Sequence, residues 1–382
     1  MEPLISQPQS PLQRRTNICL NMIVKNEAAV IERLLSSVKN VVDYFVIVDT
    51  GSSDDTPERI RVFMESQGIP GEVHFRDWVN FGLNRQQALE LAVAAGRCSW
   101  LLWIDADEEL IYDDNRVFEA LEPGVSYDLY RQLATLRYAN PHLIDIAHTR
   151  WEWCAPVHSY LRCLGPVTRK TLEGVTIISH GGGAKSHGQT SKQKYLRDAD
   201  LLEQELQRNP NDARSRFYLA QSYRDAGFHA EAYRHYELRV QMGGWPEEVY
   251  IAQCEKAALA IRLGMAHQQI VCEHLEAYRR RPGRAEALWQ LASYCRQNQR
   301  YAEGYLFAKV GKDISLPGDI LFVRRDVYDW RLLDEFAVCA YWIGQYQESA
   351  DAGRRLLAEN RYPPADKDRL EKNLGYALAK LS

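Results

Sequence analysis

The sequence predicts an α/β domain built on a Rossmann-like, mostly parallel sheet, followed by an all-α domain of helical repeats. Two observations support this prediction. Short apolar runs alternate with helical patterns through the first half of the chain, and strand patterns give way to helical periodicity from about Ser191 onward. We therefore expect a disordered tail at 1–15, an α/β domain at 16–190 and a helical repeat domain at 191–382.

The composition is ordinary for a soluble globular protein. Of the 382 residues, 46% are hydrophobic and 26% are charged, and the net charge of −4 does not indicate nucleic-acid binding. No run approaches the roughly 20 apolar residues of a membrane span. The polar stretch 1–16 lacks the apolar core of a signal peptide. The eight cysteines form no C-x-x-C pair, so we expect reduced thiols and a cytoplasmic protein.

Strand and helix patterns alternate in the first domain. Strands are predicted at 18–24, 44–48, 73–76 and 99–104, and helices at 28–42, 56–67 and 84–95. Pro57 suits the first turn of the second helix. Strands that alternate with helices favour a largely parallel sheet covered on both faces.

The last of these strands ends in a cluster of carboxylates, which are Asp105, Asp107, Glu108 and Glu109. If the backbone there is extended, Asp105 and Asp107 project to the same side. Two carboxylates held that close raise each other's pKa unless a cation relieves them, and a hard divalent cation would leave positions free for substrate phosphates. The alternative is a solvated acidic loop after a core strand.

Polar side chains also follow the first two strands. Lys25 and Glu27 leave the first strand, and Asp49 opens a turn after the second. A carboxylate at a strand end can accept a hydrogen bond from a nucleobase imide or a ribose hydroxyl. We expect Asp49 to be functional. We expect Asp54 and Asp55 to be structural, with Asp55 or the residue after it capping the next helix.

Four motifs occur in order along this domain. They are Met22-Ile-Val-Lys-Asn-Glu27, Val48-Asp-Thr-Gly-Ser-Ser-Asp-Asp-Thr56, Leu83-Asn-Arg85 and Trp103-Ile-Asp-Ala-Asp-Glu108. Together they resemble the family 2 glycosyltransferases of the GT-A fold, and the resemblance covers most of residues 16–190.

The resemblance implies a donor site for a UDP-sugar. The residues that it implies are Asp49 at the uracil, Val24, Lys25 and Glu27 along the base, Asp105 and Asp107 at the ribose and at a Mn²⁺ or Mg²⁺ ion on the diphosphate, and Arg85 near the donor. A divalent ion would stabilise the charge that develops on the leaving diphosphate without needing a proton.

The position of the catalytic base departs from the family pattern. The segment 151–161 resembles one in which Val-His-Glu ends with the presumed base, and here that position holds Ser159. A serine cannot act as a base at neutral pH without an activating partner. His158, Glu152 or Asp145 could take the role, the acceptor could be a thiol, which ionises more readily, or the chain could be inactive.

Further candidates lie in and after this segment. Three aromatic side chains could stack on a sugar ring or pack in the core, namely Trp151, Trp153 and Tyr160. An apolar strand pattern ends in His180, which is a predicted metal or diphosphate ligand, with a purely structural histidine as the alternative. The glycine-rich loop that follows carries Lys185 and could close over the donor, whereas His187 is a weaker candidate.

The second domain contains a weak internal repeat. Leu219-Ala-x-x-Tyr223 is followed by small residues, similar spacing recurs from Leu291 and from Phe336, and a degenerate copy lies around 257–264. This spacing resembles that of a tetratricopeptide unit, in which small residues let paired helices approach. The layout of the chain is similar to that of the peptide S-glycosyltransferases of glycocin biosynthesis. A concave repeat surface would suit a peptide acceptor or a subunit partner.

We therefore predict a metal-dependent, inverting glycosyltransferase that moves a hexose, glucose or a related sugar, from a UDP-sugar to a peptide, protein or glycan acceptor. Mn²⁺ or Mg²⁺ is the expected cofactor, with Asp105, Asp107 and His180 as ligands. A homodimer formed through the repeat domain is a further expectation. The alternative, which Ser159 supports, is a catalytically impaired domain that binds nucleotide sugars as a scaffold while its repeats bind proteins.

Overall fold

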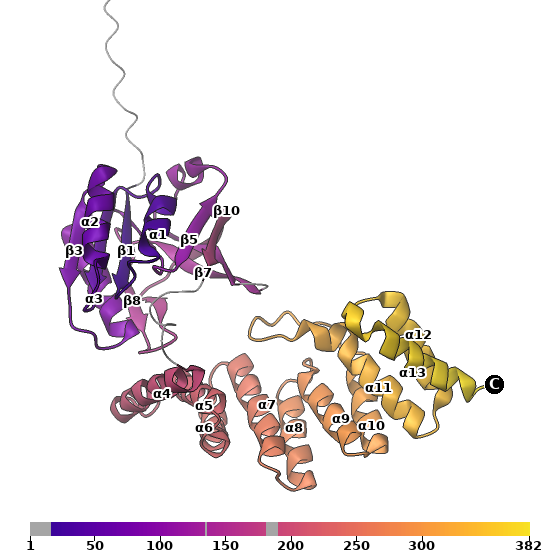
Figure 1. The fold of residues 1–382 in the computed structure, drawn as a ribbon. Coiled ribbons are helices and arrows are strands. Elements are labelled where there is room, and N and C mark those ends of the chain that lie inside the picture. Colours follow the sequence, from indigo (N-terminus) through magenta and orange to yellow (C-terminus); the bar gives the residue numbers. More distant parts are fainter. Residues whose placement is uncertain (1–16, 134–135, 181–189) are drawn as a thin grey trace, which may run out of the picture. The chain divides into compact units, whose positions relative to one another are not determined.

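The protein is described by a computed structural model over residues 17–133, 136–180 and 190–382. Two compact units divide the chain after Thr190, and each is described by itself (Figure 1). The predicted tail at 1–15 and the candidates Lys185 and His187 lie outside the described residues.

The first unit is built on one large mixed sheet. Among the described residues this sheet has eight strands, in the order β3-β2-β1-β4-β7-β6-β10-β5. The strands are β1 (Ile18–Val24), β2 (Tyr44–Asp49), β3 (Gly71–Phe75), β4 (Trp100–Trp103), β5 (Glu108–Tyr112), β6 (Val125–Leu133), β7 (Leu136–Asp145) and β10 (Thr168–Ser179), and a separate hairpin pairs β8 (Trp151–Cys154) with β9 (Tyr160–Cys163).

The predicted parallel order holds for half of this sheet. Strands β3, β2, β1 and β4 are parallel neighbours. Beyond them β7 runs antiparallel to both β4 and β6, and β5 runs antiparallel to β10, so only the β6–β10 pair is parallel there. The sheet is therefore a Rossmann-like parallel half joined to a mixed half.

Helices cover both faces of the parallel half. They are α1 (Ile31–Val38), α2 (Thr56–Ser66) and α3 (Phe81–Ala95), with a short 3₁₀ helix at Asn115–Glu119. Alternate strand residues face opposite sides of a sheet. Leu20 and Ile47 face the side on which α1 and α2 complete one apolar cluster. Cys19 and Val46 face the side on which α3 and the β8–β9 hairpin complete another, so that hairpin lies against α3.

Every strand and helix predicted in this half is present; β1 has the predicted bounds, and the other elements have at least one shifted end. The helix predicted at 28–42 is shorter, because the N–H groups of Val41 and Val42 both bond to the carbonyl of Val38 in a turn after α1. Sequence patterns do not predict β5 to β9, whose strands are short or partly polar.

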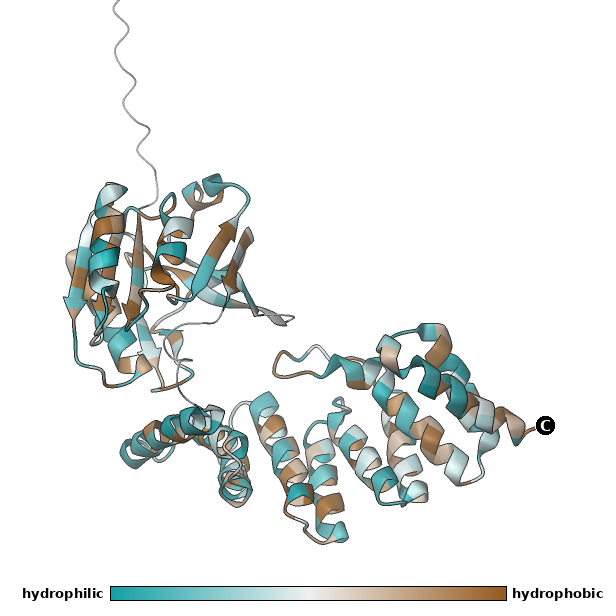
Figure 2. Ribbon diagram, in the orientation of Figure 1, coloured by the Kyte–Doolittle hydropathy of each residue, from teal (hydrophilic) through white to brown (hydrophobic). Residues whose placement is uncertain are grey.

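The second unit is a stack of helical hairpins, as predicted. Its helices are α4 (Ser191–Arg208), α5 (Ala213–Asp225), α6 (His229–Gln241), α7 (Pro246–Arg262), α8 (His267–Arg280), α9 (Glu286–Gln297), α10 (Tyr301–Gly311), α11 (Leu332–Trp342), α12 (Tyr346–Glu359) and α13 (Lys367–Ala379), with short helical turns at Val327–Arg331 and Pro364–Asp366. Each repeat motif falls on one pair, α5–α6, α9–α10 or α11–α12, and the degenerate copy falls on α7–α8. Apolar and polar residues intermingle along these helices, as amphipathic packing requires (Figure 2).

One small residue of the repeat pattern has a clear packing role. A Cβ on Gly304 in α10 would lie 2.8 Å from the Sγ atom of Cys339 and 3.2 Å from the carbonyl oxygen of Ala292. The absence of a side chain at this position therefore allows α10 to pack closely against α9 and α11.

Candidate functional site

The loops after β1, β2 and β4 meet at one edge of the sheet. These strands are parallel neighbours, with Val24 beside Asp49 and Asn21 beside Trp103, so their carboxyl ends lie together. Ligands of open α/β sheets bind beyond the carboxyl ends of the strands. The predicted site residues that follow these strands are thereby brought to one place.

The loops after β1 and β2 are joined by hydrogen bonds. The Asn26 N–H donates to Ser52 Oγ at 2.9 Å, and the Ala28 N–H donates to Asp54 Oδ2 at 3.2 Å. Asp54 is thus structural, as predicted. Asp55 is the N-cap residue of α2, one of the two expected positions, but its side chain makes no capping hydrogen bond and its carboxylate pairs with Arg59 Nε at 3.0 Å.

Asp49 holds a buried oxygen that lacks a partner. The residue is 1% exposed, and its Oδ1 accepts the N–H groups of Gly51 and Ser52, each at 2.9 Å. Its Oδ2 is buried and has no hydrogen-bond partner in the described part of the chain. Gly51 has φ +102°, which suits glycine, and the Lys25 amino group lies near it. A buried acceptor of this kind requires a donor from outside the described residues.

The predicted geometry of the acidic pair is corrected by the structure. β4 ends at Trp103, and Ala106 and Asp107 form a turn, so Asp105 and Asp107 do not lie on one extended strand. The Asp107 carbonyl accepts the His180 N–H at 3.2 Å. No hydrogen bond or ion pair to the Asp107 carboxylate occurs among the described residues, and this side chain is half-buried, which leaves it available to a ligand.

Two arginines neutralise Asp105. Arg85 from α3 pairs with Oδ1, and Arg131 from β6 lies 3.8 Å from Oδ2. Burial raises the pKa of Asp105, but the two guanidinium groups outweigh it and hold that pKa below its ordinary value. Arg131 also pairs with Glu108, which is fully buried, and burial together with the Asp105 charge raises the pKa of Glu108 to about 7. The guanidinium groups of Arg85 and Arg131 therefore compensate the negative charge of Asp105 and Glu108.

Sequence reasoning missed Arg131 and His142. His142 is fully buried, its ring stacks on Trp103 at 3.9 Å, and its Nδ1 lies 2.9 Å from the Trp103 carbonyl oxygen. Burial lowers the pKa of His142 to about 4, so the ring is neutral at pH 7. Arg131 lies on β6 and His142 on β7, and no sequence pattern indicates that β7 pairs with both β4 and β6.

Ser159, at the expected base position, lies beside the acidic cluster. Arg85 Nη1 donates to Ser159 Oγ at 2.8 Å, so one guanidinium joins Ser159 to Asp105. His158 precedes it in the same loop, is exposed and has φ +50°. His158 therefore remains near the site.

The other two proposed bases lie elsewhere. Glu152 pairs with Arg162 across the β8–β9 hairpin, on the face opposite to Trp153, which packs on Trp103. Asp145 pairs in register with Trp100, at the opposite end of β4 from Asp105, and its carboxylate accepts backbone N–H groups, including that of Gly124 at 2.6 Å. Asp145 therefore lies away from the carboxyl edge of the sheet, and the Glu152 carboxylate is engaged by Arg162.

The aromatic residues of the β8–β9 hairpin differ in burial. Trp151 and Trp153 are each 8% exposed and belong to the apolar cluster under α3, which favours core packing over sugar stacking. Tyr160 is half-buried. The guanidinium of Arg85 lies 4.9 Å from the ring centroid of Trp153. Trp153 thus faces the site from within the core.

His180 is paired with another carboxylate of the cluster. Its Nε2 lies 2.7 Å from Glu109 Oε2, and the residue follows β10. Within the described ranges no group of three or more His, Cys, Asp or Glu side chains is arranged to hold a metal ion. In the acidic loop Asp105, Glu108 and Glu109 are paired with Arg85, Arg131 and His180, whereas the described residues offer no side-chain partner to Asp107. Mg²⁺ and similar ions are often held by one or two carboxylates plus substrate phosphates, so Asp107 fits such an ion.

Known proteins that resemble this chain identify the family of the first unit. Residues 19–122 match the family described as Glycosyl transferase family 2. The N-terminal unit is a family 2 glycosyltransferase domain. Curated relatives of the glycosyltransferase domain include an uncharacterized glycosyltransferase of Rickettsia felis, 40% identical over 89 residues that cover 23% of this chain and 28% of the relative. A TPR repeat-containing protein of Synechococcus elongatus is 39% identical over 97 residues, covering 25% of this chain and 22% of that protein. The chain thus spans well under half the length of these relatives.

Two of the solved structures that match this chain are S. aureus TarS and a TPR protein. The structure of S. aureus TarS 1–349 in complex with UDP-GlcNAc has a TM-score of 0.39 at 12% identity, covering 66% of this chain and 93% of that one. A thermophilic TPR protein of Thermus thermophilus has a TM-score of 0.31 at 17% identity, covering 49% and 92% of the two chains.

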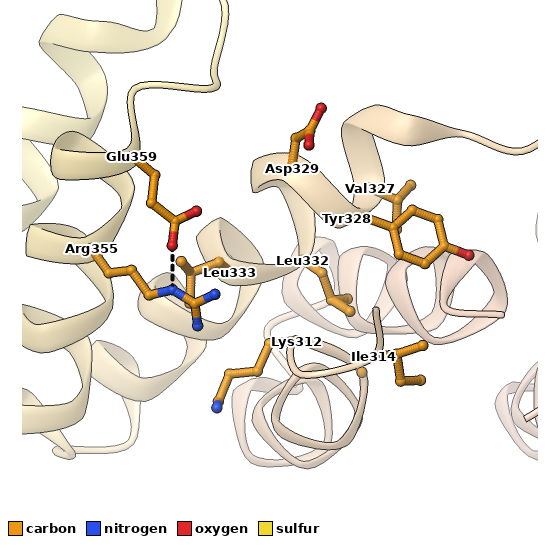
Figure 3. A pocket seen from close by; sticks show the side chains of 10 residues that line it. Lys312, Ile314, Val327, Tyr328, Asp329, Leu332, Leu333, Arg355 and Glu359 are labelled. Atoms are coloured by element: carbon orange, nitrogen blue, oxygen red, sulfur yellow. Dashed lines mark hydrogen bonds and ion pairs between the residues drawn. The ribbon is translucent and has the colours of Figure 1, made fainter. Parts of the chain in front are cut away.

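The described helices and cavities also bear on membranes and ligands. No helix within the described ranges is long and apolar enough to cross a membrane. A pocket in the helical unit lies between α10, α11 and α12, beside the ion pair of Arg355 with Glu359 at 2.7 Å (Figure 3). Its cavity of about 10 Å³ has room for one water molecule at most and not for a sugar nucleotide.

Proposed function

We propose that the protein is a metal-dependent, inverting glycosyltransferase that transfers a hexose from a UDP-sugar. The observation that carries this proposal is the edge of the sheet where Asp49, Asp105 and Asp107 meet. There a buried acceptor oxygen follows β2, and a carboxylate neutralised by arginines and a free carboxylate share the loop after β4 of a family 2 glycosyltransferase domain.

The loops after β1 and β2 would bind the nucleoside. The imide N–H of uracil is a donor, and Asp49 Oδ2 is a buried acceptor that lacks one. Val24, which ends β1, the exposed Lys25 and the half-buried Glu27 lie on the adjoining loop and would line the base. The hydrogen bonds between the two loops pre-organise this pocket and so lower the entropic cost of binding.

The acidic loop would bind the ribose and the diphosphate. Asp105 would accept from a ribose hydroxyl, and Asp107 would hold Mn²⁺ or Mg²⁺ together with the donor phosphates, with His180 close by. A divalent ion supplies stabilisation of the negative charge on the leaving diphosphate. Arg85 and Arg131 add positive charge at the same edge, and Lys185 follows His180 in the sequence.

The acceptor side lacks the carboxylate base of the family pattern. Ser159 Oγ accepts a hydrogen bond from Arg85. The hydroxyl proton of Ser159 is therefore free to be donated to a ligand, so Ser159 can act as a hydrogen-bond donor but not as a base. His158 is the base candidate that remains close. A thiol acceptor needs less assistance because it ionises near neutral pH, so a cysteine-containing peptide is the first acceptor to test, before other proteins or glycans.

The helical repeats would bind the acceptor or a second copy of the chain. Stacked helical pairs offer an extended surface of the kind that holds peptides and subunits. We propose a cytoplasmic enzyme that forms a homodimer through this unit.

Turnover of UDP-sugars by the full chain in Mn²⁺ tests the proposal. We expect release of UDP from one or more UDP-hexoses, its loss in EDTA, and a loss of at least about 100-fold in Asp107→Ala, since metal-assisted charge stabilisation contributes several kcal/mol. Asp113→Ala is the matched control, because Asp113 is exposed in the turn after β5 and should leave the rate unchanged. UDP binding without turnover would favour the scaffold alternative, and neither binding nor turnover would contradict both.

A further inference from the structure

Arg85 occupies a central position in the site. From the first turns of α3 its guanidinium pairs with Asp105 on the loop after β4 and donates to Ser159 Oγ at 2.8 Å on the loop after β8. It is the one side chain in the described ranges that hydrogen-bonds to both of these loops. The orientation of Arg85 therefore sets the position of the Asp105 carboxylate relative to the loop that carries Ser159.

Aromatic rings enclose this guanidinium. Its central carbon lies 4.9 Å from the ring centroid of Trp153 and 5.3 Å from that of Trp103, and the two indoles meet edge to face at 4.9 Å. Trp103 is stacked in turn on His142. A cation over an indole face gains about 0.5–1 kcal/mol at exposed sites and about 2 kcal/mol or more when desolvated. The rings thus restrict the long, flexible arginine side chain to one orientation.

The loop after β8 is docked on α3 by backbone contacts. The Phe81 N–H donates to the Pro156 carbonyl at 3.0 Å, and the Trp153 N–H donates to Gln86 Oε1 at 2.8 Å. Gly82 permits the approach, because a Cβ there would lie 2.2 Å from the Ala155 carbonyl oxygen. These contacts bring Trp153 and Arg85 together.

The same loop contains backbone strain. Ala155 has φ +69° and His158 has φ +50°, a left-handed conformation that residues with a side chain rarely adopt. Such conformations cost about 1–3 kcal/mol each and persist where the surrounding structure imposes them, often at functional sites. Docking on α3 is the visible source of that constraint.

We infer that Trp153 is a positioning residue that acts through Arg85, fixing the guanidinium between Asp105 and Ser159 for sugar transfer. The inference rests on the proposed function for its kinetic consequence. Trp153 is buried on the β8–β9 hairpin, and its proposed role needs no contact with the nucleotide. The chain also offers a matched control, since Trp151 lies on the same strand, is equally buried at 8% and places its indole N–H on Thr149 Oγ1 at 2.6 Å, away from Arg85.

The test compares kcat and KM for UDP-sugar turnover in Trp153→Leu, Trp153→Phe and Trp151→Leu, each corrected for the folded fraction. Misplacing a group by about 1 Å can cost 10²-fold, so we expect Trp153→Leu to lower kcat about 10- to 100-fold with KM little changed. Trp153→Phe keeps a ring and should recover most of the rate. Trp151→Leu should stay within about 3-fold of wild type, because no cation of the described residues lies over its ring.

A double-mutant cycle decides whether Trp153 acts through Arg85. In an Arg85→Gln background Trp153→Leu should change kcat less than about 2-fold, because the group that it positions is gone. Equal losses in the two tryptophan variants, or an undiminished Trp153→Leu effect in that background, would overturn the inference.

Failure of the proposed function can be distinguished from failure of the positioning role of Trp153. If the wild type turns over no UDP-sugar, the proposed function fails, and the cycle is then read on urea unfolding midpoints. Non-additive midpoint shifts for Arg85→Gln and Trp153→Leu, with additive shifts for Arg85→Gln and Trp151→Leu, would still support the contact as a positioning device, and additive shifts for both pairs would refute it.

Discussion

Replacing Asp49 by Asn tests the nucleoside site without removing a side chain. Asn keeps the size of Asp, and its single oxygen can take the place of Oδ1, which accepts the N–H groups of Gly51 and Ser52 at 2.9 Å each. Its amide nitrogen then occupies the place of Oδ2, which is buried and without a partner among the described residues. The substitution therefore changes one acceptor into a donor at a single buried position.

The expected loss of affinity follows from that change. A hydrogen bond to a charged group contributes about 1.5–3 kcal/mol, and the new amide would also set a donor against the uracil imide N–H. We expect UDP to bind about 30- to 150-fold more weakly, which corresponds to about 2–3 kcal/mol. The free energy of unfolding should change by less than about 1 kcal/mol, because the bonds to Gly51 and Ser52 are kept.

Titration calorimetry of the full chain with UDP and with CDP in Mn²⁺ measures this effect. The N3 atom of cytosine is an acceptor, so Asp49→Asn should lose UDP affinity while losing none for CDP, or gaining some. Asp55→Asn is the control, since Asp55 pairs with Arg59 at the surface and should leave UDP affinity unchanged. Wild-type UDP affinity in Asp49→Asn would refute the assignment of Oδ2 to the base, and so would an equal loss for both nucleotides.

Three further predictions concern other parts of the chain. Ser159→Glu should raise transfer to hydroxyl acceptors by about 10²-fold or more, because it restores a carboxylate at the base position, and unchanged acceptor preference in product analysis would contradict this. Gly82→Ala should lower activity and cost about 1–3 kcal/mol of stability, since its Cβ would lie 2.2 Å from a carbonyl oxygen, whereas Gly375→Ala, in open space on α13, should not destabilise the protein in urea. Burial lowers the pKa of His274 to about 4. The unfolded chain then binds more protons between about pH 6.5 and 4, so stability is complete above pH 6.5 and falls toward pH 4 by about 3 kcal/mol from this residue. His274→Leu should remove that part of the pH slope, and an unchanged slope would show that His274 does not titrate in this way.

The sequence was a good guide to elements with strong local patterns. β1, β2, β4 and the three helices around them were predicted because apolar residues recur there at strand or helix spacing, and the helical hairpins were predicted because small and large residues recur in register. The strands β5 to β9 could not be predicted in the same way. β5 and β7 pair with strands far along the chain, as in the antiparallel contact of Trp100 with Asp145.

By itself the sequence determined the family resemblance, the division into an α/β and a helical part, and the carboxylates that follow the strands, because each depends on residue types at short spacings. Only the tertiary structure decided which charges meet. It placed Arg131 and Arg85 on Asp105, turned Glu152 toward Arg162 and put Asp145 at the far end of β4. The physical reason is that electrostatic interactions act through space, and sheet register and loop docking, which bring distant residues within a few ångströms, are not encoded in local spacing.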